Sequence, residues 1–488
     1  MSIAATNQTI PIVVTPVTGN SGELQRRASD PYASVWVGAS AGSGKTTVLT
    51  SRVLRLLLAG VEPQRILCLT YTRAAAAEMA LRITGRLGNW ATCDDDALRR
   101  DLFTLQGDWP DITQQAQARR LFARVLACPG GMRIQTIHAF SQEVLKRFPI
   151  EAGLPPHFTV LEESDALALQ TTALHDVLQE AATAPDRLLG QALAQLVRQL
   201  CEQRFTTIMQ DAARERDRLA QLMTHIGGPD QLLPRLKSLL DFAPDDSAEH
   251  YLAQACDERN FAATDLRHLA RLLWEKGSKS YAARGQTIAD WLAMDQPARQ
   301  QNFATYQRAF LTKDGEITSK FVNKELLESY PELETTFLCE GRRLQSVQER
   351  LESLAVAEQS AALAVLAHTI HQRYAKAKRQ EAALDYHDLI QRTCALLQKP
   401  GIAPWILYKL DGGLDHILVD EAQDTSAAQW QIVTALAEEF FSGEGAARDK
   451  QRTLFVVGDE KQSIYRFQGA DPDAFDTMRG VFSTRITE

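Results

Sequence analysis

Positive charge is not in excess in this sequence of 488 residues. Lysine and arginine together number 53, whereas aspartate and glutamate number 61, so the net charge is −8 at pH 7. A protein that attracts nucleic acid over its whole surface is strongly basic, and this composition excludes such a general attraction. Any contact with nucleic acid must therefore be confined to a local groove.

Paired cysteines are also missing. The seven cysteines stand singly, and none belongs to a C-x-x-C pair. This spacing argues against zinc, iron–sulfur and disulfide chemistry, and it predicts reduced thiols without a metal cluster. The cysteines are Cys68, Cys93, Cys128, Cys201, Cys256, Cys339 and Cys394.

Long apolar runs are absent as well. Nowhere do about 18 apolar residues follow one another, which is the length that a membrane-spanning helix needs. The start, MSIAATNQTIPIVVTPVTGN, lacks the basic region and the apolar core of a secretory signal. We therefore expect a cytoplasmic protein, and its length suggests two or three globular domains.

Five short apolar runs predict the buried strands of a parallel sheet. They cover residues 35–37, 65–69, 133–136, 416–419 and 453–457. Between about residues 164 and 380 the apolar residues instead recur at helical spacing, as at Leu344, Val347, Leu351 and Leu354. We predict an α/β fold in which residues 1–163 and 381–488 form one discontinuous core and residues 164–380 form an all-helical insertion.

The stretch VWVGASAGSGKTT, residues 35–47, has the pattern of a phosphate-binding loop between a strand and a helix. It departs from G-x-x-x-x-G-K-[ST] at the first position, where Ala39 stands at the entrance of the loop. Backbone N–H groups would surround the phosphates, Lys45 would bridge the β and γ phosphates of ATP, and Thr46 would bind Mg²⁺. The alternative is a chance glycine-rich turn. The expected nucleotide contacts are Ala39, Ser40, Ala41, Gly42, Ser43, Gly44, Lys45, Thr46 and Thr47.

The stretch HILVDEAQD supplies the carboxylates that such a site needs, directly after an apolar strand. Asp420 would hold Mg²⁺, and Glu421 would polarise the attacking water. An acidic cap of a following helix is the alternative. That alternative leaves the apolar residues 417–419 unexplained, so we favour the catalytic interpretation.

Three further segments each follow a predicted strand: TYTRAAAAEM, TIHAF and VGDEKQSIYRFQGAD. Together with AGSGKT and DEAQDT they resemble the ordered motifs of superfamily one helicases of the UvrD/Rep type. The resemblance implies a P-loop RecA-like core with a helical insertion and an ATP- and Mg²⁺-dependent DNA helicase of 3′–5′ polarity.

The resemblance also implies roles for particular residues. Gln25 matches the glutamine that reads adenine, and Gln462 matches the one that senses the γ-phosphate. Taken alone, Gln25 could equally be a surface residue, His138 a buried structural histidine, and each aromatic a core residue. The positions that match contacts to single-stranded DNA are Thr70, Tyr71, Thr72, His138, Tyr465, Arg466 and Phe467. Tyr71, Arg73 and Phe467 depart from the commoner family residues, which puts the geometry of base stacking in question.

Within this family, RLLLAGVEPQRILCLTYT, the alanine run and FLTKDGE resemble helicase–nuclease subunits of the AddA type. Such subunits act with an AddB-type subunit in recombinational repair of double-strand breaks, which implies a heterodimer. Family members continue into a second RecA-like domain and a nuclease, and neither is found before Glu488. We therefore expect this chain alone to be poorly active; a non-motor ATP- and DNA-binding module is the alternative.

Basic and aromatic residues gather in one part of the helical region, where we expect loops that contact duplex DNA. A merely soluble surface is the alternative. These residues are Trp274, Lys276, Lys279, Tyr281, Arg284, Lys313, Lys320 and Lys324.

Overall fold

The computed structural model describes residues 21–38, 44–198, 200–322, 324–409, 413–441, 451–459, 475 and 477–482. The chain forms two compact units. The first contains residues 1–166 and 378–488, and the second contains residues 167–377.

A five-stranded parallel sheet with the order β1-β7-β6-β2-β3 forms the centre of the first unit. The prediction of an α/β fold with a parallel sheet is confirmed. The strands are β1 (Val35–Gly38), β2 (Ile66–Thr70), β3 (Arg133–Thr136), β6 (His416–Val419) and β7 (Thr453–Gly458). A separate parallel pair joins β4 (Thr159–Val160) to β5 (Ala383–Leu384).

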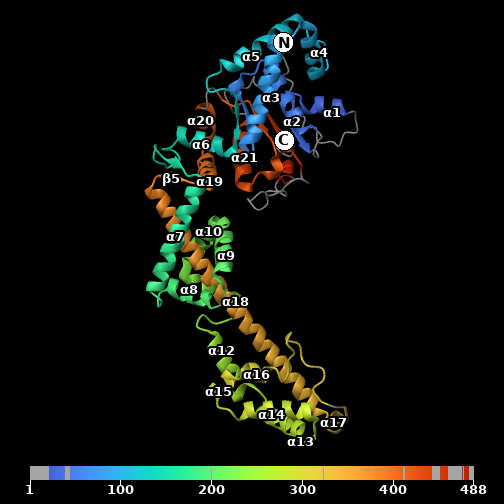
Figure 1. Ribbon diagram of the computed structural model, residues 1–488, viewed down its shortest axis with the longest axis vertical. Coiled ribbons are helices and arrows are strands. Elements are labelled where there is room, and N and C mark those ends of the chain that lie inside the picture. Colours follow the sequence, from blue (N-terminus) through green and yellow to red (C-terminus); the bar gives the residue numbers. More distant parts are fainter. Residues whose placement is uncertain are drawn as a thin grey trace, which may run out of the picture. The chain divides into compact units, whose positions relative to one another are not determined.

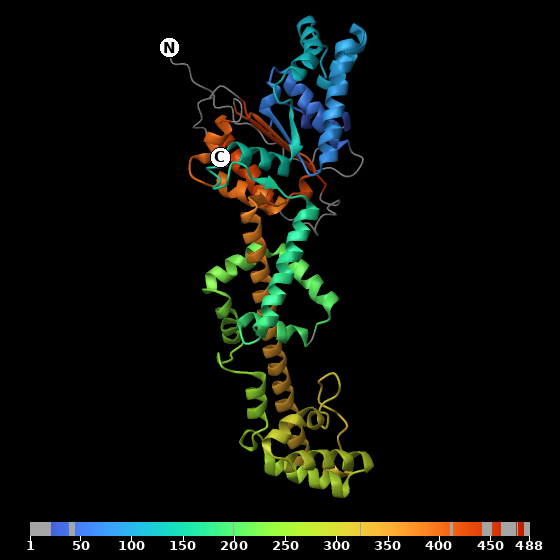
Figure 2. The ribbon, with the colours of Figure 1, turned by 60° about the vertical axis from the view of Figure 1, so that its left-hand side comes forward.

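Helices cover both faces of the five-stranded sheet, which is why its strands are continuously apolar. Alternate residues of one strand enter different cores: Leu67 and Leu69 pack on one side, Ile66 and Cys68 on the other. Helices α6, α19, α20 and α21 cover the first side, and α2 to α5 cover the second (Figures 1 and 2).

The helices of the first unit are α1 (Ser21–Ala28), α2 (Lys45–Leu58), α3 (Arg73–Thr92), α4 (Asp95–Gln106), α5 (Ile112–Leu126), α6 (Ile137–Arg147), α19 (Tyr386–Leu397), α20 (Ile402–Lys409) and α21 (Ala427–Phe441). Two short 3₁₀ helices, η1 (Pro63–Arg65) and η4 (Ala422–Asp424), precede β2 and follow β6. Helices α7 (Glu163–Thr183) and α18 (Glu332–Gln380) have residues in both units.

The described part of the second unit is helical, apart from an isolated bridge between Leu311 and Ile317. Its further helices are α8 (Leu188–Val197), α9 (Glu202–Arg214), α10 (Arg216–Ile226), α11 (Leu232–Leu239), α12 (Ala248–Ala255), α13 (Ala263–Lys276), α14 (Lys279–Ala293), α15 (Gln296–Gln301), α16 (Phe303–Gln307) and α17 (Lys324–Ser329), with η2 (Pro229–Gln231) and η3 (Glu258–Asn260).

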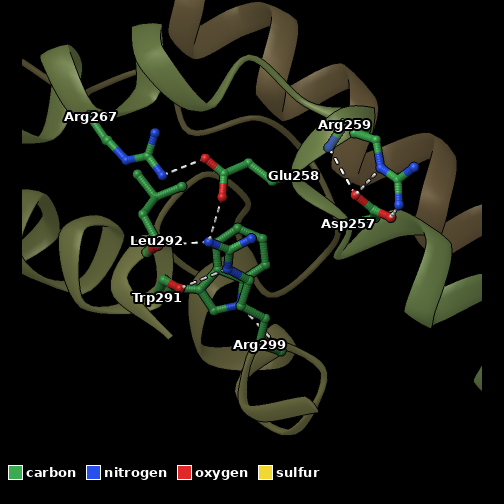
Figure 3. Close-up of polar contacts among 7 residues, drawn as sticks. All are labelled: Asp257, Glu258, Arg259, Arg267, Trp291, Leu292 and Arg299. Atoms are coloured by element: carbon green, nitrogen blue, oxygen red, sulfur yellow. Dashed lines mark hydrogen bonds and ion pairs between the residues drawn. The ribbon is translucent and has the colours of Figure 1, made fainter. Parts of the chain in front are cut away.

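A buried arginine holds part of this unit together. Arg299 donates hydrogen bonds to the carbonyl oxygens of Trp291, at 3.3 Å, and Leu292, at 2.7 Å (Figure 3). It also donates to Glu258 at 3.2 Å, and Glu258 accepts a second hydrogen bond from Arg267. The guanidinium lies over the Trp291 ring, so its charge is neutralised and its donors are used inside the fold.

The expected loops around Trp274 are helices instead. Trp274 and Lys276 belong to α13, and Lys279, Tyr281 and Arg284 belong to α14. Buried Leu266, Leu269, Leu273, Ile288 and Trp291 give both segments an apolar face, which outweighs their polar composition. Lys313 and Lys320 do lie between helices, and Lys324 begins α17.

Helix α18 has 49 residues and, by length and composition alone, could cross a membrane. Half of its most apolar 18-residue window is buried inside the protein. Core helices of soluble proteins have the same properties, so this is weak evidence for a membrane span.

Candidate nucleotide-binding site and neighbouring surface

Three adjacent strands of the sheet end at the same edge. Gly38 at the end of β1 pairs with Gly458 at the end of β7, and Val419 at the end of β6 pairs with Val456. Ligands of parallel α/β sheets bind outside the carboxyl ends of the strands. The segments that follow β1, β6 and β7 are therefore brought together at this edge.

The N-terminus of α2 is open toward this edge. Its N-cap, Gly44, has φ 87°, a left-handed conformation that glycine adopts without strain, and it receives no side-chain cap from the described residues. A Cβ atom on Gly44 would lie 3.0 Å from Nε2 of Gln25, so the predicted adenine-reading side chain lies against this cap. Unpaired N–H groups and the helix dipole make such an end suitable for an anion.

The Lys45 side chain faces two carboxylates. Its Nζ is 3.6 Å from Oε2 of Glu421 and 4.0 Å from Oδ2 of Asp459, and the side chain is only 11% exposed. Nζ is buried and donates no hydrogen bond within the described residues. A buried ammonium with unused donors fits a ligand that brings its own negatively charged oxygens, such as a phosphate.

Asp420 is a buried carboxylate directly after β6. Its backbone N–H donates to the carbonyl oxygen of Leu69 at 2.8 Å, which fixes the end of the strand. Burial, and next the neighbouring Glu421, raise the pKa of Asp420 to about 6. A bound divalent cation would offset both effects, so this side chain fits the predicted Mg²⁺ ligand.

Glu421 has a strained backbone, with φ 50° and ψ 45°. The left-handed region is costly for a residue with a Cβ atom, and such strain clusters at functional sites. Its N–H donates to Oδ1 of Asp420 at 3.0 Å, and its Oε2 accepts a hydrogen bond from Nε2 of Gln423 at 2.7 Å. The strained turn therefore places this half-exposed carboxylate beside Lys45.

The other predicted nucleotide contacts are less well defined. Thr46 is half-buried and Thr47 exposed in the first turn of α2. Residues 39–43 and Gln462 lie outside the described residues. No group of three or more histidine, cysteine, aspartate or glutamate side chains in the described ranges could hold a metal ion. Mg²⁺ commonly uses one or two protein ligands together with phosphate and water oxygens, which Asp420 and Thr46 would satisfy.

The predicted DNA contacts after β2 have local structural partners. Thr70 is buried, and its Oγ1 donates to the carbonyl oxygen of Thr72 at 3.0 Å. Thr72 is the N-cap of α3, where its Oγ1 accepts from the N–H of Ala75 at 3.1 Å. Tyr71 between them is half-buried. These threonines shape the turn, whatever else they contact.

His138, near the start of α6, packs edge-on against Tyr386 with ring centroids 5.5 Å apart. Burial, and next the charges of Arg73 and His387, lower the pKa of His138. Nη2 of Arg73 lies 3.3 Å from the hydroxyl of Tyr386. Cationic and aromatic side chains thus gather beside the ends of β2 and β3. Tyr465, Arg466 and Phe467 lie outside the described residues.

Sequence reasoning missed three residues of these sites. Asp459 directly follows an apolar strand, the same signal that singled out Asp420. Tyr386 begins α19 just after the short strand β5, where an aromatic residue could have been noticed. Gln423 stands within DEAQD, yet an amide after two acids carries no signal of its own, and only the fold reveals its contacts.

Known proteins resemble this chain along nearly its whole length. The sequence pattern of the UvrD/REP helicase N-terminal domain matches residues 21–483. The ATP-dependent helicase/nuclease subunit of the AddA type from Lactobacillus helveticus is 27% identical, over 93% of this chain and 36% of the relative. The corresponding values are 27%, 95% and 36% for Pelotomaculum thermopropionicum, and 30%, 92% and 34% for Levilactobacillus brevis. The chain therefore spans about a third of the length of these relatives.

Proposed function

Because the chain belongs to the UvrD/REP helicase N-terminal domain family, we propose that it is the ATP-binding motor domain of a DNA helicase. The observation that carries the proposal is the convergence of Lys45 with Glu421 and Asp459 at the open N-terminus of α2. A buried lysine, a helix end and two successive acids after a neighbouring strand are the parts that nucleotide hydrolysis requires.

The residues divide the work of hydrolysis. The N–H groups at the start of α2 and the Nζ of Lys45 would bind the phosphates, and Gln25 would read adenine. Asp420 and Thr46 would hold Mg²⁺, which supplies positive charge against the phosphate oxygens. Glu421, held beside Lys45 but half-exposed, would accept a proton from the attacking water. Gln462 would report the nucleotide state to the DNA-binding side.

Single-stranded DNA would run along the ends of β2 and β3, where Tyr71, His138 and Tyr386 lie near Arg73. Base stacking on aromatic side chains is tolerant of sequence, as a translocating motor requires. Tyr465, Arg466 and Phe467 would extend this surface. The exposed Trp274 and the lysines near it would contact duplex DNA. The net charge of −8 is consistent with contacts limited to such local surfaces.

The wider role follows from the likeness to helicase/nuclease subunits. We propose 3′–5′ translocation in recombinational repair of double-strand breaks in the cytoplasm, in a complex with an AddB-type subunit. In this proposal residues 1–163 and 381–488 are the RecA-like core, and residues 164–380 are an insertion that serves DNA binding.

Two substitutions test the hydrolytic site. We expect Lys45→Ala to abolish most Mg·ATP binding in a fluorescence titration while circular dichroism stays unchanged, because Nζ donates no hydrogen bond to the described protein. Glu421→Gln should retain binding but lower turnover by a factor on the order of 10² or more.

Lys146→Ala, which removes an exposed lysine from the last turn of α6, is the matched control and should behave like the parent. Turnover should be measured with and without single-stranded DNA, and in a polypeptide that also carries a second RecA-like domain. Equal nucleotide binding by Lys45→Ala and the parent would contradict the proposal.

A further inference from the structure

Gln423 connects the ends of two strands through one side-chain amide. It lies in η4, directly after β6, and is buried. Its Nε2 donates to Oε2 of Glu421 at 2.7 Å and to Oδ2 of Asp424 at 3.3 Å. Its Oε1 accepts from the backbone N–H of Asp459, after β7, at 2.8 Å. Each polar atom of the amide therefore has a partner.

The partners also determine which way the amide points. With the opposite orientation, the amide oxygen would face the carboxylates of Glu421 and Asp424, and the NH₂ group would face the N–H of Asp459. Both arrangements are repulsive, so the observed orientation is the one that the surroundings impose. The side chain is consequently a directional link from the backbone of Asp459 to the carboxylate of Glu421.

The fold leaves little room for any other arrangement. A Cβ atom on Gly458 would lie 2.9 Å from Oε1 of Gln423 and 2.8 Å from the Phe475 ring, so glycine permits this close approach. Glu421 itself is held in a left-handed conformation. Two independent features thus bring the strand ends close enough for one glutamine to join them.

We propose that Gln423 is a positioning residue for the hydrolytic step, acting through Glu421. It holds Oε2 of Glu421, the same atom that lies 3.6 Å from Lys45, and it anchors that carboxylate to the backbone at the end of β7. The inference rests on the proposed function, because it assigns Gln423 to the carboxylate that accepts the proton. In the sequence, Gln462 follows Asp459 by three positions, so the anchor lies next to the segment expected to sense the γ-phosphate.

Two variants of Gln423 separate positioning from packing. Gln423→Glu keeps the volume and the acceptor for the N–H of Asp459, but it turns a carboxylate toward Glu421. Gln423→Leu removes both kinds of hydrogen bond. Gln429→Glu is the matched control, because buried Gln429 uses its Oε1 to accept from the N–H of Ser426, at 3.0 Å, and a carboxylate preserves that contact.

The measurement is steady-state ATP hydrolysis by the polypeptide in which the Glu421→Gln variant has been characterised. We expect both Gln423 variants to lower kcat by about 10- to 100-fold while KM for ATP changes by less than about threefold, because a misplaced base affects only the transition state. In the Glu421→Gln background, Gln423→Leu should lower the residual single-turnover rate by less than about twofold, since its effect passes through Glu421.

The outcomes are distinct. A Gln423→Glu variant with the kcat of the parent overturns the inference, as does a Gln423→Leu variant that lowers the rate equally with and without Glu421. If Gln423→Leu fails to fold, Gln423→Glu, combined with Glu421→Gln, supplies the same comparison. If the parent and the Gln429→Glu control both lack hydrolysis, the proposed function itself fails, and the inference falls with it.

Discussion

His416, at the start of β6, shows how one buried side chain couples the fold to pH. Its Nδ1 is 2.8 Å from Oγ1 of Thr453, and the residue is only 4% exposed. Burial, and next the charge of Arg52, lower the pKa of His416 to about 4, against a smaller opposite effect of Asp415. The imidazole is therefore neutral in the folded protein at pH 7.

The sign of the pH dependence follows from this lowered pKa. An unfolded histidine binds a proton below about pH 6.5, whereas His416 in the folded protein does not until about pH 4, so stability is lost as the pH falls between these values. We expect this residue alone to lower the free energy of unfolding by about 2 kcal/mol between pH 7 and pH 5.

Urea unfolding at both pH values measures this loss. His416→Gln should reduce the difference between pH 7 and pH 5 by about 2 kcal/mol. The control, His157→Gln, replaces an exposed histidine of the same unit and should leave the difference as it is in the parent. An unchanged difference in His416→Gln would show that this imidazole does not carry the effect.

Among the elements, α2 does more than present its N-terminus to a phosphate. Arg52, buried in its middle, donates to the carbonyl oxygens of Ala28, Asp30 and Ala33 and, at 2.9 Å, to Oγ1 of Thr453. Burial lowers its pKa to about 9, so the guanidinium is still charged at pH 7. The helix thereby holds the segment between α1, which carries Gln25, and β1.

We predict that Arg52→Met destabilises the first unit by on the order of 3 kcal/mol, because several buried acceptors lose their donors. Since the segment leading to Gln25 is released, affinity for ATP should fall more than affinity for inorganic triphosphate. Competition titrations with the two ligands measure this ratio. Arg120→Met, at an exposed position of α5, is the control. Equal losses for both ligands would argue against a role in holding the adenine-reading segment.

For the whole molecule, the nucleotide site has one wall in this chain. Among the described residues, Lys45 is the only cation within ion-pair distance of Glu421. Phosphoryl transfer also needs a cation against the charge that develops on the γ-phosphate, and an arginine in that role is worth about 10³ to 10⁵ in rate in other systems. In relatives of this type a second RecA-like domain would supply it.

We therefore expect a polypeptide of these 488 residues to bind Mg·ATP weakly, to show little DNA-stimulated hydrolysis and to leave a duplex with a 3′ single-stranded tail intact. Adding a second RecA-like domain, fused or in trans, should restore all three properties. An ATP-dependent strand-displacement gel is the measurement. Unwinding by the 488-residue polypeptide alone would refute the need for a second domain, and continued inactivity after the addition would favour a non-motor binding module.

The sequence alone was sufficient wherever the signal is local. The five predicted strands differ from those observed by one residue at most at either end, because a buried strand is a run of neighbouring apolar residues. Lys45, Asp420 and Glu421 could be singled out because each directly follows a strand or begins a helix. The family could be recognised for the same reason, since its motifs are short and continuous.

The tertiary structure decided what depends on residues far apart in the chain. Sequence order does not reveal that β7 lies between β1 and β6, and that order is what brings Asp459 and Gln423 to the site of Lys45. The polar composition around Trp274 predicted loops, but burial of one apolar face stabilised helices there. Packing acts on faces assembled from distant segments, whereas composition and spacing describe only neighbours, so the contacts of Gln423 could be known only from the fold.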